Sequence, residues 1–233
     1  MAHLSYLCFF VGRHSIKERR SLFWVAEGAA FRYNRNQNAE RTEIESMQIE
    51  NCRETDVAHV GAFYDSVVLW LDHHINYPKW MYRIYPSESF VREMTAAGEQ
   101  YICTDNQRLV GAFVLNADPQ GNYQKGNWKR DLPDGSYMVL HALAISPELQ
   151  GKGLGAEVVR FCVQKAKADG YKALRLDIVP GNLPAQKLYE KNGFKYAGNA
   201  DLDRGIEHIP VFSLYELNWQ TEEESIRFYD VQR

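Results

Sequence analysis

Three glycines at alternate positions, Gly151, Gly153 and Gly155, have the spacing in this chain that points most clearly to chemistry. They follow the apolar run LAIS and a short polar turn, and they precede a segment with helical periodicity. Small residues at the start of a helix leave backbone N–H groups uncovered, and the helix dipole adds positive potential there. The pattern therefore predicts a site for a diphosphate-bearing ligand.

Two other phosphate-binding patterns fit this loop less well. A P-loop requires a hydroxyl residue directly after its lysine, whereas here Gly153 follows Lys152. The letters of a dinucleotide fingerprint are met by Gly151, Gly153 and Ala156, with Asp177 near the position of a ribose-binding acid. However, a polar spacer separates the strand from the first glycine, and too little chain follows for a doubly wound domain. We therefore expect Asp177 to be a surface or sheet-face residue.

Hydrophobic periodicity indicates the elements that must position this loop. We expect strands over residues 48–53, 100–104, 109–117, 137–145, 172–179, 195–200 and 210–219. We expect helices over residues 153–169 and 183–192, and two earlier helices that begin after Asp56 and after Ser87 or Ser89. The aromatic residues 76–86, which contain two prolines, are expected to form irregular helix. The order of these elements predicts one mixed α/β domain.

The composition is that of an ordinary globular protein and excludes several classes of function. Hydrophobic residues make up 45% and charged residues 24%, the formal net charge is −3, and no basic run indicates nucleic-acid binding. The apolar run at residues 4–11 is too short to cross a bilayer, so we expect neither a membrane span nor a signal peptide. The dispersed cysteines predict reduced thiols in a cytoplasmic protein, and the spacing of Cys and His predicts no metal site.

The two ends of the chain differ in character from its middle. Residues 1–46 mix basic and acidic side chains irregularly, and we expect either a disordered leader or translation from a start codon that lies too early. Residues 47–219 carry all the expected strands and helices and form the expected domain. Residues 220–233 are expected to be a charged C-terminal tail.

Two motifs in the right order resemble the GNAT N-acetyltransferase superfamily. QGKGLG at residues 150–155 looks like the acyl-CoA signature of that family, Gln or Arg, two variable residues, Gly, one variable residue, and Gly or Ala. The later stretch LRLDIVPGNLPAQKLYEKNGFKYAG resembles the family's next strand, its Asn-capped helix and the strand after it. The likeness covers about residues 47–219. It implies the α/β GNAT fold, in which a mixed, mostly antiparallel central sheet splays at the acyl-CoA site and is flanked by helices.

The resemblance implies that acetyl-CoA is the co-substrate, and it assigns the contacts to three parts of the chain. The strand backbone at Leu143, Ala144 and Ile145 would pair with the pantetheine arm. Asn182 would cap the following helix and contact CoA. The pyrophosphate would be held by the loop residues Gln150, Gly151, Lys152, Gly153, Leu154, Gly155 and Ala156. The lysine of this loop either adds charge near the phosphates or is simply solvated.

The resemblance also implies two catalytic side chains. A leaving thiolate needs a proton, and the family's general acid is a tyrosine at the position of Tyr189; its alternative role is to fill the helix–sheet interface. The HALA run resembles arylalkylamine acetyltransferases, in which strand histidines help to deprotonate the amine. His141 is therefore the candidate base, on the same strand face as Val139 and Leu143, although a lone histidine is often a hydrogen-bonded core residue. Other candidate bases are Glu99, Asp177 and the free carboxylates of the polar loop at residues 118–135.

The acceptor side is expected to be aromatic. Trp80, Tyr82 and Tyr85 belong to the segment that lies over the acceptor in this family, and an aromatic wall suits an apolar or cationic amine, although core packing explains the same residues.

We expect a metal-independent enzyme that moves an acetyl group to a primary amine of a small molecule or peptide by direct attack. A catalytically silent acyl-CoA-binding sensor is the alternative. The C-terminal strand with Tyr215 and Trp219 would suit the edge of a homodimer.

Overall fold

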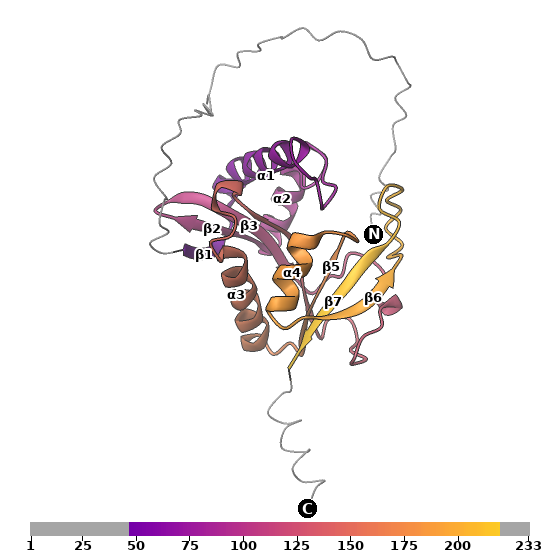
Figure 1. Cartoon of the computed structure of the whole chain (residues 1–233). Helices are drawn as coiled ribbons and strands as arrows, with labels where there is room; N and C mark the ends of the chain where they lie inside the picture. Colours follow the sequence, from indigo (N-terminus) through magenta and orange to yellow (C-terminus); the bar gives the residue numbers. More distant parts are fainter. Residues whose placement is uncertain (1–46, 220–233) are drawn as a thin grey trace, which may run out of the picture. The chain divides into compact units, whose positions relative to one another are not determined.

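A seven-stranded open sheet runs through residues 47–219, the part of the chain that the computed structural model describes (Figure 1). The expectations about residues 1–46 and 220–233 lie outside the described residues. The strand order is β1-β2-β3-β4-β5-β7-β6, and every neighbouring pair is antiparallel except β4 and β5. The expectation of a mixed, mostly antiparallel sheet is therefore confirmed. The strands are β1 (Met47–Asn51), β2 (Gln100–Asp105), β3 (Arg108–Asn116), β4 (Met138–Ile145), β5 (Ala173–Ile178), β6 (Lys195–Ala200) and β7 (Phe212–Asn218).

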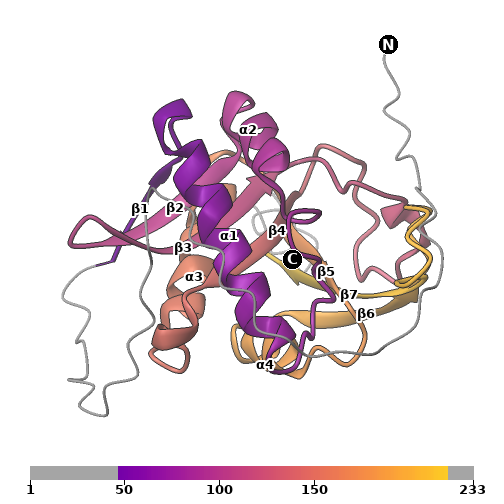
Figure 2. The ribbon, with the colours of Figure 1, turned by 90° about the horizontal axis from the view of Figure 1, so that it is seen from above.

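Helices cover both faces of the sheet (Figures 1 and 2). They are α1 (Val57–Asp72), α2 (Glu88–Ala96), α3 (Leu154–Ala168) and α4 (Leu183–Lys191). Neighbouring residues of β2 show the division, because Ile102 packs with side chains of α1 and α2, whereas Cys103 packs with those of α3 and α4. Among the described helices, none is long and apolar enough to cross a bilayer.

Local chemistry accounts for several of the element boundaries. Ser87 caps α2, since its hydroxyl accepts a hydrogen bond from the amide of Phe90. The β2–β3 hairpin turns through Asn106 and Gln107, both with positive φ, as a tight two-residue turn requires. Gly193 follows α4 at φ +92°, the usual conformation after a helix end. The strand and helix boundaries predicted from the sequence agree with the structure to within about two residues.

The aromatic segment between α1 and α2 is the exception. Residues 76–86 form turns and one isolated bridge between Met81 and Tyr85, so the prediction of irregular helix was wrong. Two residues of the segment, Lys79 and Arg83, have positive φ, which is incompatible with a right-handed helix. Pro78 and Pro86 also lack the amide hydrogen that a helix needs.

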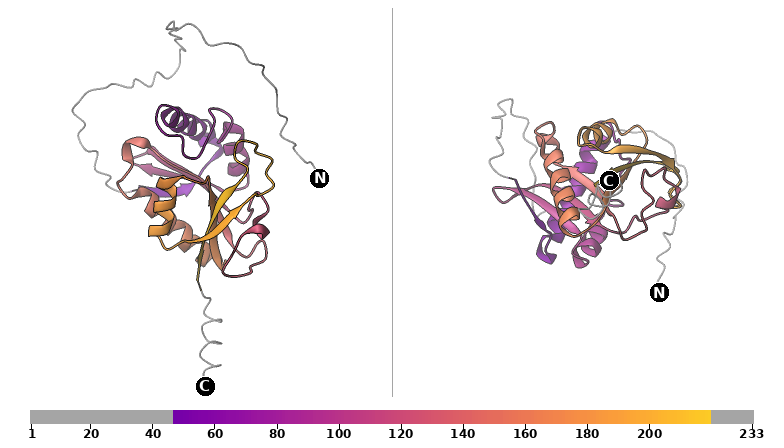
Figure 3. Two further views of the ribbon diagram at one scale, coloured as in Figure 1. Left: turned by 45° about the vertical axis from the view of Figure 1, so that its right-hand side comes forward. Right: turned by 90° about the horizontal axis from the view of Figure 1, so that it is seen from below.

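Two long connections meet at one end of the sheet, beside β6 and β7. The amide of Asn122 donates to the carbonyl of Leu202, and the amide of Asn127 donates to the carbonyl of Ala197. Figure 3 shows this end of the molecule from two further sides, with the β3–β4 connection lying against the yellow β6–β7 region. Segments that are far apart in the sequence therefore cover the same end of the sheet.

The central strands β4 and β5 pair over only a short distance. Their parallel ladder consists of Met138 with Leu174 and Val139 with Arg175, whereas β4 continues along β3 as far as Ile145. Beyond Val139, the edge of β4 that faces β5 therefore has no strand partner among the described residues. The expectation that the sheet splays at this point is confirmed.

A bulge in β4 lies next to this parting of the strands. The β3–β4 register shifts between Ala112 and Val114, and Ala142 lies opposite the shift at φ +48°. Val139 packs in the cluster under the β6–β7 end, whereas Leu143 packs against the α3 and α4 face. The prediction that His141 shares a strand face with Leu143 was therefore wrong, because the extra residue breaks the alternation.

The C-terminal strand β7 lies inside the sheet, between β5 and β6. Tyr215 is buried, and the indole of Trp219 donates to the carbonyl of Tyr171 at 2.8 Å. The prediction that this strand suits a dimer edge was therefore wrong, since both of its edges are already paired within the chain.

Candidate functional site

The glycine loop presents open space in front of its backbone. Gly151 and Gly153 have φ values of +80° and +88°, which favour glycine, and a Cβ added at either position would meet no described atom within 4 Å. Gly155 differs, because a Cβ there would lie 3.1 Å from the side chain of Leu188 on α4. The first two glycines thus leave room for a ligand, and the third allows α3 and α4 to approach closely.

Four amides of this loop are free to bind an anion. The amides of Gly151, Gly153, Leu154 and Gly155 make no hydrogen bond within residues 47–219. The other three are engaged inside the loop, since Gln150, Lys152 and Ala156 donate to the carbonyls of Pro147, Leu149 and Gly153. The four free amides stand at the N-terminus of the 15-residue helix α3, where the helix dipole favours phosphate oxygens. The backbone therefore fits the diphosphate group that the sequence predicts.

The open edge of β4 adjoins this loop. The amide of Ser146 donates to the carbonyl of Val110 on β3, and the register pairs Ala144 with Ala112. Because successive amides of a strand point to opposite sides, those of Leu143 and Ile145 face the edge that β5 has left. Such an edge can form main-chain hydrogen bonds with an extended ligand.

Asn182 caps the helix on the far side of the opening. Its side-chain oxygen accepts a hydrogen bond from the amide of Ala185 at 3.3 Å, as the sequence predicts for the start of α4. Its contact with CoA stays a prediction.

Tyr189 is the buried residue of α4. Its ring packs edge-on against Phe194 at 5.5 Å, and its hydroxyl makes no hydrogen bond within the described residues. Leu188, its neighbour on the helix, is half-buried and packs against the same hydrophobic cluster. Burial raises the pKa of Tyr189 above its ordinary value, and the nearby Cys162 adds to the rise. The phenol is therefore protonated and available as a donor at neutral pH.

His141 lies on the face of the sheet away from α4. Its Nε2 is 2.9 Å from the carbonyl oxygen of Asp118 and 3.2 Å from Oδ1 of Asn116. A carbonyl only accepts, so Nε2 carries the proton and the lone pair is on Nδ1. Burial lowers the pKa of His141 from 6.5, partly offset by the charge of Asp177. The imidazole is therefore neutral at neutral pH, as a proton acceptor must be.

A buried ion pair lies beside this histidine. Arg204 binds both carboxylate oxygens of Asp177, at 2.7 and 2.9 Å, and the hydroxyl of Tyr123 donates to the same carboxylate at 2.7 Å. Burial opposes the charge, but the Arg204 guanidinium holds the pKa of Asp177 below its ordinary value. Of the two positions expected for Asp177, surface or sheet face, the structure shows the second, because its side chain is only 9% exposed and lies on the face of β5 opposite Leu176 and Ile178.

Arg204 also fixes the loop that carries the histidine's partner. Its Nε donates to the carbonyl of Gln120, and one of its terminal nitrogens donates to the carbonyl of Pro119. These residues follow Asp118 directly, so one arginine joins β5, the β3–β4 connection and the β6–β7 connection. No pattern in the sequence indicates this role, because Arg204 stands in an unpatterned polar stretch.

Two of the three predicted aromatic residues, Trp80 and Tyr85, lie together over the same face of the sheet as His141. The Trp80 ring packs edge-on against Tyr64 of α1 and against Tyr85, with ring centroids 6.0 and 6.2 Å apart. Tyr82 is separate from them, exposed and stacked with Arg83. The ammonium group of Lys79 donates to the carbonyl of His208, which links this segment to the β6–β7 connection.

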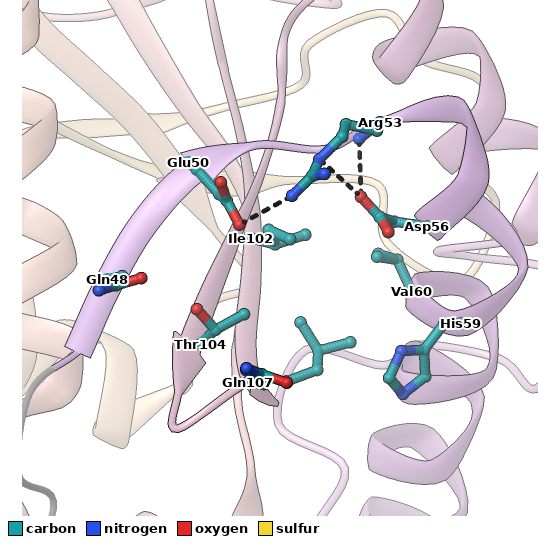
Figure 4. A pocket seen from close by; sticks show the side chains of 10 residues that line it. Gln48, Glu50, Arg53, Asp56, His59, Val60, Ile102, Thr104 and Gln107 are labelled. Carbon is teal, nitrogen blue, oxygen red and sulfur yellow. Dashed lines mark hydrogen bonds and ion pairs between the residues drawn. The ribbon is translucent and has the colours of Figure 1, made fainter.

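A polar cavity of about 330 Å³ lies elsewhere, between β1, the β2–β3 hairpin and the start of α1 (Figure 4). Arg53 crosses it and pairs with Glu50 and Asp56. None of the predicted site residues lines this cavity. Within residues 47–219, no group of His, Cys, Asp and Glu is arranged to hold a metal ion.

Known proteins with the same architecture include bacterial acetyltransferases. An acetyltransferase of the GNAT family from Streptococcus agalactiae superposes with a TM-score of 0.60 at 18% identity, over 77% of this chain and 99% of its own. A GNAT-family acetyltransferase from Streptococcus pneumoniae gives 0.55 at 20% identity, over 75% and 100%. The protein yncA from Salmonella typhimurium, solved with its cofactor acetyl-CoA, gives 0.53 at 16% identity, over 76% and 96%.

At these identities the solved structures establish the fold alone. A search of curated proteins found no match to the sequence. The family model of the acetyltransferase (GNAT) family matches residues 67–194, more than half of the chain, and this range contains the glycine loop, β4, β5 and α4. The chain therefore belongs to the acetyltransferase (GNAT) family.

Proposed function

We propose that this chain transfers the acetyl group of acetyl-CoA to a primary amine of a small molecule or peptide, in the opening between β4 and β5. The observation that carries the proposal is the continuity of free backbone donors, from the open edge of β4 to the four unpaired amides at the start of α3. A diphosphate linked to an extended arm matches this arrangement, because the loop binds an anion and the strand edge binds amides.

The donor side holds acetyl-CoA through backbone groups. Gly151, Gly153, Leu154 and Gly155 bind the pyrophosphate, with Lys152 at the rim of the loop. Leu143 and Ile145 pair with the pantetheine arm along the edge of β4. Asn182, at the start of α4, borders the other side of the opening.

Tyr189 acts as the general acid. Acetyl-CoA is a thioester, and its CoA sulfur leaves as a thiolate unless it receives a proton. The pKa of a free thiol is about 8.5. The phenol of Tyr189 is protonated, has no competing partner among the described residues and comes from the α4 side of the opening. It can therefore hand its proton to the departing sulfur and regain one from solvent.

His141 acts as the base that takes the proton of the attacking amine. Its neutral imidazole has one free lone pair, on Nδ1, and the Asp118 carbonyl fixes that tautomer. Two other candidate bases are already engaged, since Glu99 accepts from Asn116 and Asp177 is held by Arg204. The base and the acid thus come from opposite faces of the sheet.

The acceptor amine enters beside the aromatic pair Trp80 and Tyr85. Their faces suit an apolar amine, or a cation that loses its proton before attack. The segment that carries them is tied through Lys79 to the β6–β7 connection, so both loops border the acceptor.

The test is the release of CoA thiol from acetyl-CoA in the presence of polyamines, aminoglycosides, arylalkylamines, amino acids or peptides. Amine-dependent thiol release that is lost in Tyr189→Phe supports the proposal. Tight binding of acetyl-CoA without turnover on any amine contradicts it and favours a catalytically silent sensor.

A further inference from the structure

The β4 bulge has an unusual residue at its centre. Ala142 lies at φ +48°, a region in which bulges of this kind normally carry glycine, because a Cβ there is strained. The register assigns a β3 partner to His141 and to Ala144, but none to Ala142 or Leu143. Contacts from outside the β3–β4 ladder must therefore stabilise the backbone of the bulge.

Tyr64 of α1 provides a bond at this point. Its hydroxyl donates to the carbonyl oxygen of Ala142 at 2.8 Å, across 78 positions of sequence. Its side chain is fully buried, with 0% exposure. A carbonyl left unpaired next to the core would be unfavourable, so this one hydroxyl stabilises the strained conformation.

A second buried side chain serves the opposite strand. Gln100 of β2 is 0% exposed, and its Nε2 donates to the carbonyls of Phe113, at 2.9 Å, and Tyr101, at 3.0 Å. Phe113 is the β3 residue at which the ladder with β4 is interrupted. Gln100 therefore bonds the β2 side of the β3 residue at the break, whereas Tyr64 bonds the bulged strand itself.

The bulge decides which way the following amides point. A strand without the extra residue would be shifted by one position, which would turn the amides of Leu143 and Ile145 toward β3. With the bulge in place, these amides face the open edge between β4 and β5.

We propose that Tyr64 is a positioning residue for acetyl transfer: its hydroxyl holds the Ala142 bulge, and the bulge directs the Leu143 amide into the opening between β4 and β5. The effect on turnover rests on the proposed function, whereas the effect on the bulge does not. Tyr64 also contacts Trp80, so the same residue joins the acceptor segment to the edge of β4.

Four variants test this role: Tyr64→Phe, Ala142→Gly, the double variant, and Tyr137→Phe as a control. Tyr137 loses a comparable hydroxyl bond, to Asp134 at 2.6 Å, away from the bulge. We expect Tyr64→Phe to lower kcat about five- to tenfold and to change the Kd for CoA less than about twofold. Ala142→Gly in the same background restores kcat to within about twofold, because glycine adopts φ +48° without strain.

Amide hydrogen exchange over residues 138–146 gives a readout that does not depend on activity. Tyr64→Phe is expected to speed exchange in this segment, the double variant to reverse that change, and Tyr137→Phe to leave it slow. Unchanged exchange in Tyr64→Phe, or no recovery in the double variant, overturns the positioning role. If the wild-type protein transfers no acetyl group, the proposed function fails, and the exchange pattern alone decides the role of Tyr64.

Discussion

The two sides of the β4–β5 opening differ in which groups form them: main-chain amides on one side and side chains on the other. The proposed donor side consists of main-chain amides from one continuous stretch, residues 143–156, with glycine where a Cβ would intrude. The proposed acceptor side consists of side chains from segments far apart in the chain, joined by Asp177, Arg204 and His141. The geometry of a site made of main-chain amides depends on the backbone conformation of a few residues. The geometry of a site made of side chains depends on every side chain in the hydrogen-bond network.

Because of this difference, we expect the donor side and the acceptor side to respond differently to mutation. On the donor side, the side chains of Gln150 and Lys152 are exposed and the proposed contacts come from the backbone, so substitutions that change the backbone are expected to matter most. On the acceptor side, each removed group leaves a buried partner unpaired. We propose that the two sides meet at the reacting atoms, since Tyr189 lies on the α4 face of the sheet and His141 on the opposite face.

The largest expected effect is on the shared chemistry. Tyr189→Phe should lower kcat by roughly 100-fold or more, because it removes the proton donor, while the Kd for acetyl-CoA changes little. Steady-state kinetics together with calorimetry measures both. Tyr215→Phe is the matched control, since Tyr215 belongs to the same hydrophobic cluster. Equal turnover in the two variants would remove Tyr189 from the mechanism.

The next effect is on the acceptor network. Arg204→Met should lower the free energy of unfolding by about 3 kcal/mol, because the Asp177 carboxylate stays buried without its cation. Urea unfolding measures the change. Lys125→Met is the control, since Lys125 joins the same two connections through Asp203 at the surface, and its loss should leave stability nearly unchanged. Similar losses in both variants would mean that the network adds nothing to the acceptor side.

A smaller effect is expected from the donor loop. Gly153→Ala should raise the Kd for acetyl-CoA about tenfold, because alanine disfavours φ +88° and its Cβ takes space in front of the amides. Gly170→Ala is matched to it, at φ +83° and equally open, but at the other end of α3. If both variants bind acetyl-CoA equally well, the glycine loop is not the phosphate site.

The smallest effect is a pH dependence of stability. His141 is buried neutral, and its folded pKa lies below the ordinary 6.5 even though Asp177 faces it together with Arg204 and the Asp118 backbone. The unfolded state therefore binds the proton first, so this contribution is present above pH 6.5 and is lost as the pH falls through the folded pKa. His141→Gln should reduce the slope of the unfolding free energy against pH below pH 6.5. His59→Gln, an exposed change on α1, should leave the slope as in the wild-type protein.

The sequence could predict the donor side because its signals are local. Strand and helix periods, the glycine spacing and the Asn182 cap each depend on a few neighbouring residues, and the structure brings them together as expected. The acceptor side could not be predicted in the same way. Arg204 and Asp177 pair across 27 positions, and the residues next to Arg204 in the sequence do not indicate a buried arginine.

The bulge shows the same limit inside a correctly predicted strand. Alternation places His141 and Leu143 on one face, but Ala142 adopts a conformation that alanine rarely takes. The bond from Tyr64 that accompanies it comes from a helix 78 positions earlier, so it becomes visible only in the folded chain.

The most direct test of the account is amide hydrogen exchange of the wild-type protein with and without acetyl-CoA. We predict protection of residues 143–145 and 151–156 and no change in the β1–α1 cavity lined by Glu50, Arg53 and His59. Protection at that cavity, or none along β4 and the glycine loop at saturating acetyl-CoA, would contradict the placement of the donor between β4 and β5.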